Sequence, residues 1–355
     1  MNKSILINVR CMGNEFSGVQ RYTEEIIRGR CCNMVRPPSI LKSGIMGHLW
    51  EQICLGLMVS PKELLLSPAN TGPLFLKNQI LVVHDVATLV HPEWFTGLFS
   101  LWYRWLLPKL IKRVQRIVTV SEFSKGEICR TVGVSPAKIS VIHNGVDVTS
   151  LRFTYDSEVG KVMKDLLDKK YLLFVGSLEP RKNLTRLLEA WGRVNFEDIS
   201  LFVCGGSVGR VFSEDQLCFS QKNVEFLGRV SDVDLAHLIG SACGFVYPSL
   251  YEGFGLPPLE ALITGCPVLV SDIPVMKELF SSVGEEQPGI IFCNPHCVDS
   301  MVEGLVKLVG LSQDDRRSHI LNGSNLAEKY SWQKSSSALW DIVENEYLVL
   351  QGVVI

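Results

Sequence analysis

The sequence predicts an α/β protein with two domains, each holding a parallel β-sheet covered by helices. Short apolar runs alternate with helix-like segments along the chain, and most positions of these runs are apolar, without regular alternation with polar residues. Continuous apolarity is typical of strands that are buried on both faces, as in a parallel sheet between helices. The length of 355 residues exceeds one ordinary core and fits two domains.

The strand-like runs are spread over both halves of the chain. The first is Ser4–Val9, and the later ones cover residues 80–83, 116–120, 138–142, 171–175, 200–204, 244–247 and 267–270. The region 29–61 carries few strand signals. We therefore expect the N-terminal domain to contain fewer strand–helix units than usual.

A polar stretch marks the expected domain boundary. Residues 147–170 are polar and weakly periodic, and Tyr171–Gly176 directly afterwards restarts the pattern as a first strand would. We therefore expect domains at residues 1–160 and 161–355. The last helix of the second domain can pack back onto the first.

Composition and charge exclude several classes of protein. The net charge of −2 gives no support to nucleic-acid binding, and 46% hydrophobic with 20% charged residues is typical of a soluble enzyme. No apolar stretch approaches the roughly 18 residues of a membrane-spanning helix, and the N-terminus lacks the features of a signal peptide. We expect a cytoplasmic protein whose 11 cysteines are mostly reduced core thiols.

The segment 99–114 is an expected helix with a basic side. Its apolar residues have helical spacing, and a basic stripe on the roughly opposite side consists of Lys109, Lys112, Arg113 and Arg116. Such a helix can lie on an anionic membrane surface. A core-packed helix with a solvated basic side explains the same spacing. Peripheral contact with the inner face of a membrane is therefore one of two interpretations.

The segment 252–261 carries the strongest chemical pattern. It reads Glu-Gly-Phe-Gly-Leu-Pro-Pro-Leu-Glu-Ala, follows a strand and leads into a helix. Glycines at such a turn let backbone N–H groups approach a diphosphate at the helix N-terminus, where the dipole favours negative charge. Because Glu252 and Glu260 would repel a phosphate, we expect both to accept hydrogen bonds from sugar hydroxyls. A plain tight turn followed by a helix acid would explain only one of these glutamates.

The segment 176–183 is the second motif of the C-terminal half and reads Gly-Ser-Leu-Glu-Pro-Arg-Lys-Asn. It follows the first strand of that half. Ligands of open α/β sheets bind outside the carboxyl ends of strands, so Arg181 and Lys182 are expected in the same crevice as the first motif. Their charges can neutralise a diphosphate leaving group. A solvated pair at a helix start is the alternative, and the glycine-rich loop in the same domain favours the functional interpretation.

A histidine and an aspartate, His84 and Asp85, follow the expected strand 80–83. Such a pair can form a metal site, a general base or a buried structural histidine. No second histidine lies at ligand spacing, so we expect no metal. The position at the carboxyl end of a strand favours an active-site role for His84.

Six motifs together resemble the retaining glycosyltransferases of family 4, and they extend over nearly the whole chain. They are Ser17–Tyr22, His84–Asp85, Val120–Ser124, Ile142–Asp147, Glu179–Asn183 and Glu252–Glu260. This family shares the GT-B fold. The resemblance therefore implies two Rossmann-like domains that face each other across a cleft, with the acceptor on the N-terminal side and the nucleotide sugar bound by the C-terminal domain.

The resemblance also implies roles for individual residues. Lys182 and Arg181 would contact the donor diphosphate, Glu260 the ribose hydroxyls and Glu252 the transferred sugar. The implied catalytic residues are thus His84, Arg181, Lys182 and Glu252. The implied donor-binding residues are Gly18, Val230, Gly253, Phe254, Gly255, Leu256 and Glu260, with Asp85 on the acceptor side. Many family members carry an arginine where this chain has Ser177, so Arg181 is expected to take over that role.

The implied activity is the transfer of a hexose with retention of configuration, without a metal or another cofactor. Family members with these motifs often use GDP-mannose and build surface polysaccharides on lipid carriers, which implies mannose transfer to a lipid-linked saccharide. Since the sequence shows no convincing protein nucleophile, we favour front-face substitution, in which the departing phosphate accepts the proton of the acceptor. A nucleotide-sugar epimerase of the GT-B type and a non-catalytic nucleotide-binding protein are the alternatives.

Overall fold

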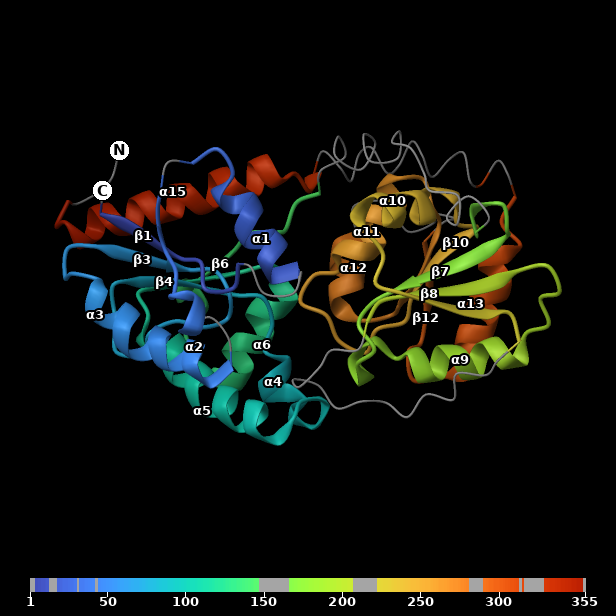
Figure 1. Ribbon diagram of the computed structural model, residues 1–355, viewed down its shortest axis with the longest axis horizontal. Helices are drawn as coiled ribbons and strands as arrows, with labels where there is room; N and C mark the ends of the chain where they lie inside the picture. The colour runs from blue at the N-terminus through green and yellow to red at the C-terminus, as the bar shows by residue number, and fades with distance from the viewer. Residues whose placement is uncertain are drawn as a thin grey trace. The chain divides into compact units, whose positions relative to one another are not determined.

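The structure, a computed structural model, separates into two compact units (Figure 1). Unit 1 comprises Met1–Pro92, Gly97–Gly145 and Tyr330–Ile355, and unit 2 comprises Glu93–Thr96 and Val146–Lys329. The residues that the structure describes are 4–12, 18–30, 32–41, 44–146, 166–206, 222–280, 290–312, 315 and 329–353. The boundary expected between residues 160 and 161 lies outside these residues.

Unit 1 is built on a six-stranded parallel sheet with the strand order β2-β1-β3-β4-β5-β6. The strands are β1 (Ile5–Asn8), β2 (Asn33–Val35), β3 (Leu64–Ser67), β4 (Gln79–Val83), β5 (Arg116–Thr119) and β6 (Ile139–Val141). The prediction of a reduced N-terminal domain is wrong. No strand signal marks β2 in the sequence, because this edge strand has three residues and is largely exposed, so it lacks a continuous apolar run.

Helices cover both faces of the sheet of unit 1 (Figure 1). One face packs against α1 (Gly18–Ile27) and α15 (Trp332–Leu350). The other face packs against helices that share two apolar clusters with the strands. The helices and helical turns on this side and in the connections are η1 (Ser39–Leu41), α2 (Gly44–Trp50), η2 (Glu51–Leu55), α3 (Gly56–Met58), α4 (Ala87–Val90), α5 (Gly97–Arg113), α6 (Glu122–Val132) and η4 (Pro136–Lys138). The turn η3 (Pro92–Trp94) begins with the residue of unit 1 that precedes Glu93–Thr96 of unit 2.

The last helix, α15, is part of unit 1 although the chain reaches it only after unit 2. Ser336 Oγ and Trp340 Nε1 donate hydrogen bonds of 3.1 and 2.8 Å to the carbonyl of Ile26, at the end of α1. Arg116 Nε lies 2.6 Å from the buried carboxylate of Glu346. These bonds fasten α15 to α1 and to the start of β5.

The helix expected at residues 99–114 is α5, which ends at Arg113. The basic stripe is therefore shorter than predicted. Arg116 is the first residue of β5, and its guanidinium is paired with Glu346 instead of lying on the surface of α5. Lys109, Lys112 and Arg113 are the members of the stripe that are exposed on this helix.

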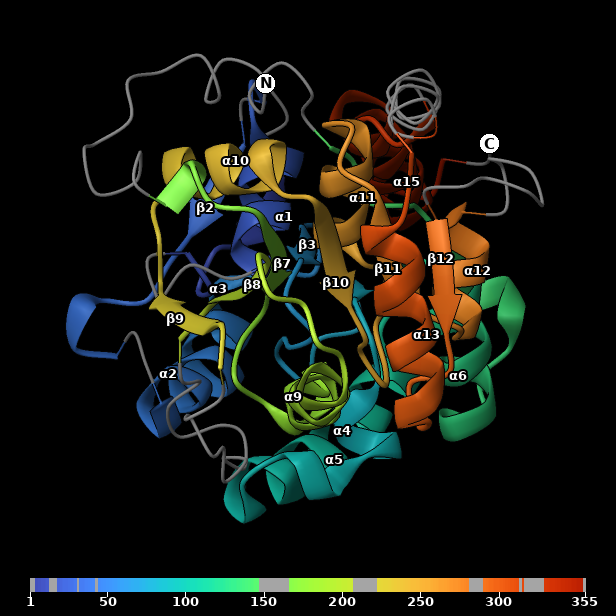
Figure 2. The ribbon, with the colours of Figure 1, turned by 90° about the vertical axis from the view of Figure 1, so that its right-hand side faces the viewer.

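Unit 2 contains a second six-stranded parallel sheet, with the order β12-β11-β10-β7-β8-β9 (Figure 2). Its strands are β7 (Tyr171–Val175), β8 (Ser200–Cys204), β9 (Val224–Gly228), β10 (Gly244–Tyr247), β11 (Val268–Ser271) and β12 (Ile290–Cys293). The chain adds β8 and β9 on one side of β7, then returns to add β10, β11 and β12 on the other side. The order reverses between β7 and β10, which makes this point the topological switch of the sheet.

Helices also cover both faces of the second sheet. Leu184 and Leu187 of one helix and Leu305 of another pack on the side of β7 and β8 that shares one large apolar cluster. Figure 1 shows α9 and α13 on that face and α10, α11 and α12 on the opposite face. The helices are η5 (Pro180–Lys182), α9 (Leu184–Arg193), α10 (Asp232–Ser241), α11 (Leu256–Ile263), α12 (Pro274–Phe280) and α13 (Val298–Val309). Both predicted parallel sheets are thus present.

Replacing Gly145 by alanine tests how tightly α15 is held. A Cβ atom at Gly145 would lie 2.0 Å from the backbone nitrogen of Trp332, so one of the two backbones would have to move. We expect Gly145→Ala to lower the free energy of unfolding by about 1–3 kcal/mol in urea titrations. The control is Gly126→Ala in α6, where a Cβ would meet no atom within 4 Å and stability should be equal or slightly higher. Equal stability of the two variants would contradict the close approach.

Candidate active site

The candidate site lies where β7 and β10 end. These neighbouring strands are parallel, with Phe174 paired to Val246, so the loops that follow them leave the sheet at the same edge. This edge is also the point at which the strand order reverses. In open α/β sheets, such a switch point is where a ligand finds room between diverging loops.

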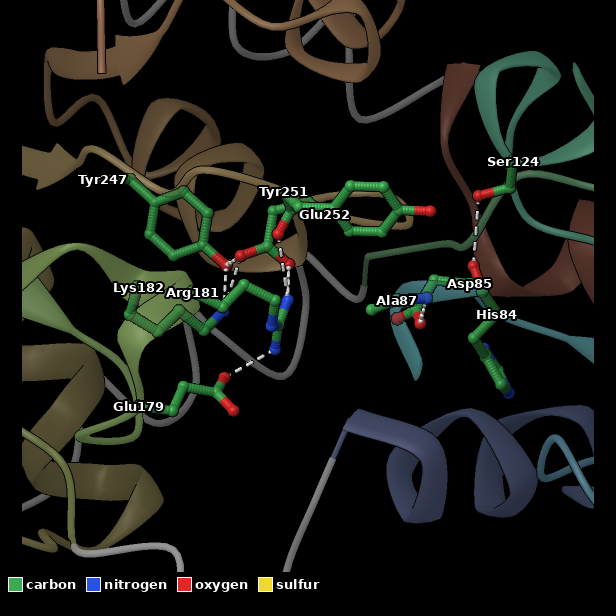
Figure 3. Close-up of polar contacts among 10 residues, drawn as sticks. All are labelled: His84, Asp85, Ala87, Ser124, Glu179, Arg181, Lys182, Tyr247, Tyr251 and Glu252. Atoms are coloured by element: carbon green, nitrogen blue, oxygen red, sulfur yellow. Dashed lines mark hydrogen bonds and ion pairs between the residues drawn. The ribbon is translucent and has the colours of Figure 1, made fainter. Parts of the chain in front are cut away.

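Four charged side chains and a tyrosine meet at this edge in a compact network (Figure 3). Lys182 Nζ lies 2.7 Å from Glu252 Oε1, and Arg181 Nη1 lies 2.6 Å from Glu252 Oε2. Arg181 also pairs with Glu179 at 2.7 Å. The hydroxyl of Tyr247 lies 2.7 Å from Lys182 Nζ and 2.9 Å from Glu252 Oε1. One carboxylate therefore holds both cations of the second motif.

The network is buried except for the half-buried Arg181, and burial changes how its groups ionise. Burial and the neighbouring Arg181 guanidinium lower the pKa of Lys182. Burial alone would raise the pKa of Glu252, but the charges of Arg181 and Lys182 outweigh it and hold this pKa at about 2. Glu252 is therefore ionised at neutral pH.

The backbone around Asn183 keeps the two loops together. Asn183 has a positive φ of 60°, and its buried amide donates to the carbonyls of Pro248 and Pro295 at 3.0 and 2.8 Å. The amide of Leu250 donates to the carbonyl of Arg181 at 2.8 Å. The turn that carries both cations is thus tied to the loop that carries Glu252.

The glycine-rich loop enters α11 through a position that only glycine fits well. Gly255 precedes the helix with a φ of 106°, and a Cβ there would lie 2.6 Å from the Cε of Met276. Gly253 and Phe254 are buried, and Leu256 is half-buried. Glu260 is buried on the helix that follows. The loop therefore brings backbone N–H groups to the start of α11, beside the network.

Val230 follows the neighbouring edge strand. It is half-buried between β9 and α10, and the side chain of Arg229 lies across Gly206 at the end of β8. A Cβ on Gly206 would be 2.9 Å from Arg229 Nε. Val230 thus lies at the same edge of the sheet as the network, two strands away from β7.

The expected residues of unit 1 lie at the carboxyl edge of the first sheet. Gly18 is exposed at the start of α1, the helix that follows β1. His84 follows β4, and its Nε2 lies 2.8 Å from the carbonyl oxygen of Pro68. Asp85 accepts a hydrogen bond from the amide of Ala87 at 3.0 Å, which is an ordinary turn contact.

Tyr247 and Glu179 were not among the site residues that the sequence predicted. Tyr247 ends a strand that reads as continuously apolar, so its hydroxyl carried no separate signal. The hydroxyl of a buried tyrosine usually has a hydrogen-bond partner. A tyrosine at the end of a strand, just before a glycine-rich loop, could therefore have been assigned to the site. Glu179 lies inside the second motif, but its pairing with Arg181 depends on the folded turn.

Two family models match the chain. The model of glycosyl transferases group 1 matches residues 161–323, and the model of glycosyltransferase family 4 matches residues 73–150. The first match contains the whole network, and the second contains His84 and Asp85. Each match falls mainly within one unit.

Curated relatives with similar sequences include mannosyltransferases. The O-antigen chain mannosyltransferase RfbU of Salmonella typhimurium is 32% identical over 69% of this chain and 65% of its own length. The O-antigen chain mannosyltransferase B of Escherichia coli is 28% identical over 74% of this chain and 69% of its own length. The chain thus spans about two thirds of the length of these relatives.

Solved structures with the same fold extend over almost the whole chain. Anabaena HepE, solved with UDP and glucose, superposes with a TM-score of 0.70 at 14% identity and covers 96% of this chain and 99% of its own. WaaG, a glycosyltransferase of lipopolysaccharide biosynthesis, gives a TM-score of 0.68 at 16% identity over 95% and 99%. The fold is that of the GT-B glycosyltransferases. The two family models and the relative at 32% identity place the chain in glycosyltransferase family 4.

The shifted pKa of Glu252 predicts a specific loss of stability in acid. Because the folded pKa of about 2 lies below the ordinary value of 4.5, the stabilisation is complete above pH 4.5 and is lost as the pH falls toward 2. Its size is on the order of 3 kcal/mol. Urea unfolding across this range should show a steeper decline for the wild type than for Glu252→Gln. Glu189→Gln removes an exposed carboxylate and should keep the wild-type slope; equal slopes in all three proteins would refute the assignment.

Proposed function

We propose that the protein transfers mannose from GDP-mannose to a saccharide acceptor with retention of configuration. The observation that carries this proposal is the pair of the half-buried Arg181 and the buried Lys182, held by Glu252 at the switch point of unit 2. Two cations beside a glycine-rich helix start are suited to a diphosphate. The mannosyltransferase names of the relatives support mannose as the sugar.

A diphosphate can replace Glu252 as the partner of both cations. Lys182 is nearly inaccessible, and its charge is now balanced by one carboxylate. A bound diphosphate supplies at least as much negative charge, so the cations can turn to it without becoming unpaired in a buried site. Glu252 would then be free to accept hydrogen bonds from hydroxyls of the transferred sugar. Glu260 would do the same for the ribose, and the backbone of Gly253 to Leu256, with Val230 nearer the base, would complete the donor site.

The proposed reaction needs no nucleophile from the protein. The acceptor oxygen forms a bond to the anomeric carbon on the face from which the diphosphate departs. The bond between that carbon and the phosphate oxygen breaks, and the departing phosphate takes the proton of the acceptor hydroxyl. Arg181 and Lys182 stabilise the charge that develops on the leaving group. Since the protein itself supplies these charges, we expect turnover to continue when divalent metal is chelated.

On the acceptor side, His84 is prepared to accept a hydrogen bond. Burial lowers its pKa, so the ring is neutral at physiological pH. The carbonyl of Pro68 can only accept a hydrogen bond, so the proton of the neutral ring lies on Nε2 and Nδ1 is an acceptor. A sugar hydroxyl is a matching donor. Gly18 is proposed to approach the diphosphate, and Asp85 to shape the acceptor side through its turn.

The acceptor is proposed to be lipid-linked and to belong to surface polysaccharide synthesis. The names of two relatives refer to O-antigen chains. An enzyme that extends such a carrier would act in the cytoplasm, at the inner face of the membrane.

A panel of nucleotide sugars tests the donor. We expect GDP-mannose, and GDP to a smaller extent, to raise the melting temperature of the wild-type protein more than the corresponding UDP compounds. Glu260→Gln should lose the shift with GDP as well as with GDP-mannose. Glu252→Gln should keep the shift with GDP, because this variant removes the carboxylate that competes for the cations, and should lose the additional shift with intact donor. If no nucleotide sugar stabilises the wild type, the proposal fails; loss of the GDP shift in both variants would refute the assigned roles.

Lys182→Ala tests the leaving-group role directly. We expect turnover to fall by about two orders of magnitude, the usual cost of removing one donor to transition-state charge. Turnover is measured as the transfer of radioactive mannose from GDP-mannose to the acceptor. Circular dichroism establishes that the variant is folded. The matched control is Lys169→Ala, an exposed lysine of the same unit that pairs with Glu225 and should leave turnover unchanged. Turnover of Lys182→Ala equal to that of the control would remove Lys182 from the site.

A further inference from the structure

The segment 44–58, formed by α2, η2 and α3, has an apolar outer surface. Every fourth residue points outward and is a large hydrophobic side chain: Ile45, Leu49, Ile53 and Leu57. Leu57 is 83% exposed and Ile45 is 75% exposed. The neighbouring Met46 and Met58 are also exposed. The inner surface of the same segment is apolar as well, because Trp50 and Leu55 pack in the core.

An ordinary surface helix has polar side chains on its outer side, and this segment has large apolar ones there. The exposed positions of α9 include Thr185, Glu189 and Arg193, as expected for a helix that meets water. In the segment 44–58, all of which the structure describes, the one acidic side chain is Glu51, and it is fully buried. A helical segment that is hydrophobic on both sides is typical of one that is covered by something other than water.

The outward direction of the stripe is fixed by polar contacts on the inner side. Glu51 accepts hydrogen bonds from Asn8 at 2.7 Å and Thr71 at 2.5 Å and pairs with Arg10 at 3.2 Å. Gln52 donates to the carbonyl of Gly72 at 2.8 Å and accepts from the amide of Leu74 at 2.9 Å. Rotating the segment so that the stripe faced inward would break these bonds. The carboxylate of Glu51 would then be exposed to solvent or buried without a partner. The apolar surface is therefore built into the fold.

The N-terminal half of α5 adds to this surface. His48 of α2 packs edge-on against the rings of Trp102 and Tyr103, so the two helices are neighbours (Figure 1). Toward solvent, α5 presents Leu98, Leu101 and Trp105, with Leu98 81% exposed. We call these three residues and the stripe at positions 45, 49, 53 and 57 the apolar face.

Cations lie beside the apolar face, and the one acidic side chain in the helices that form it, Glu51, is buried. The helix α5 has four basic residues, Arg104, Lys109, Lys112 and Arg113, and no acidic residue. The ammonium of Lys109 lies over the ring of Trp105, 4.0 Å from its centroid. Arg113 donates to the carbonyl of Phe75, whose side chain is also exposed. A tryptophan with leucines on one side and lysine and arginine on the other is the composition of a helix at a membrane interface.

We propose that the apolar face docks on an anionic lipid bilayer, with the side chains of residues 45–57 and 98–105 entering the headgroup and acyl boundary. Within the described residues, no helix is both long and apolar enough to span a bilayer. The positive charge without exposed acids matches an anionic lipid surface. The proposal rests on the proposed function in one respect: a lipid-linked acceptor gives the protein a reason to bind a membrane. It differs from the basic-stripe interpretation in one measurable respect: apolar insertion persists at salt concentrations that screen charge.

The experiment is co-sedimentation of the full chain with vesicles of phosphatidylcholine, with and without phosphatidylglycerol. It is done at low salt and at about 1 M salt, where the screening length is about 3 Å. We expect the wild type to bind anionic vesicles best and to keep a clear part of this binding at high salt. The double variant Ile53→Gln, Leu57→Gln should bind at least about tenfold more weakly under every condition. The triple variant Lys109→Gln, Lys112→Gln, Arg113→Gln should lose the preference for anionic vesicles but keep the salt-resistant binding.

Controls separate this proposal from misfolding, self-association and the proposed function. Val306→Gln changes an exposed apolar residue on α13 of unit 2 and should bind like the wild type. Unchanged circular dichroism, melting temperature and stabilisation by GDP would show that the double variant is folded.

Sedimentation velocity without lipid tests whether a second copy of the chain covers the apolar face instead of a membrane. The proposal is overturned if wild type does not bind vesicles, if the double variant binds equally, or if the wild type is a dimer that this variant dissociates. If vesicle binding follows the apolar face while no nucleotide sugar binds, the docking surface stands and the donor proposal fails.

Discussion

Two parallel strands, β7 and β10, are direct neighbours although two further strands separate them in the chain. Parallel pairing forces their carboxyl ends to the same edge, so the cations that follow one strand meet the glutamate that follows the other. The candidate site depends on this pairing more than on any single side chain. Had β10 been added beyond β9, Lys182 and Arg181 would lie several strands away from Glu252, and each charge would need another partner.

The same network bears on how the proposed donor site would accept an anion. A buried cation without a partner is costly, so the protein keeps Arg181 and Lys182 neutralised by carboxylates of its own. Tyr247 bridges Lys182 and Glu252 and limits the positions that both can take. In the proposed function, a diphosphate would take the place of Glu252 as the anionic partner of these cations. Binding would then cost the rearrangement of a few side chains instead of the burial of new charge.

In unit 1, polar burial serves a different purpose. Glu51 and its three partners turn the segment 44–58 so that its large aliphatic side chains face outward. Such an arrangement lowers solubility unless the surface is covered, so the fold maintains an exposed apolar surface with a buried charge. The helix α15 also belongs to unit 1 and covers one face of its sheet. Its bonds to Ile26 and Arg116 hold it there.

The sequence by itself determined the α/β class, most central strands and the two loops that meet at the candidate site. These features are local: a buried parallel strand is a continuous apolar run, and a glycine-rich turn reads directly from consecutive residues. The edge strand β2 was not predicted, because its three largely exposed residues carry no such signal. Only the tertiary structure decided that Glu252 holds both cations, that Tyr247 joins them, that Arg116 pairs with α15 and that the stripe from Ile45 to Leu57 faces outward. Each of these depends on which strands become neighbours and which side of a helix is buried, and residues far apart in the chain set both.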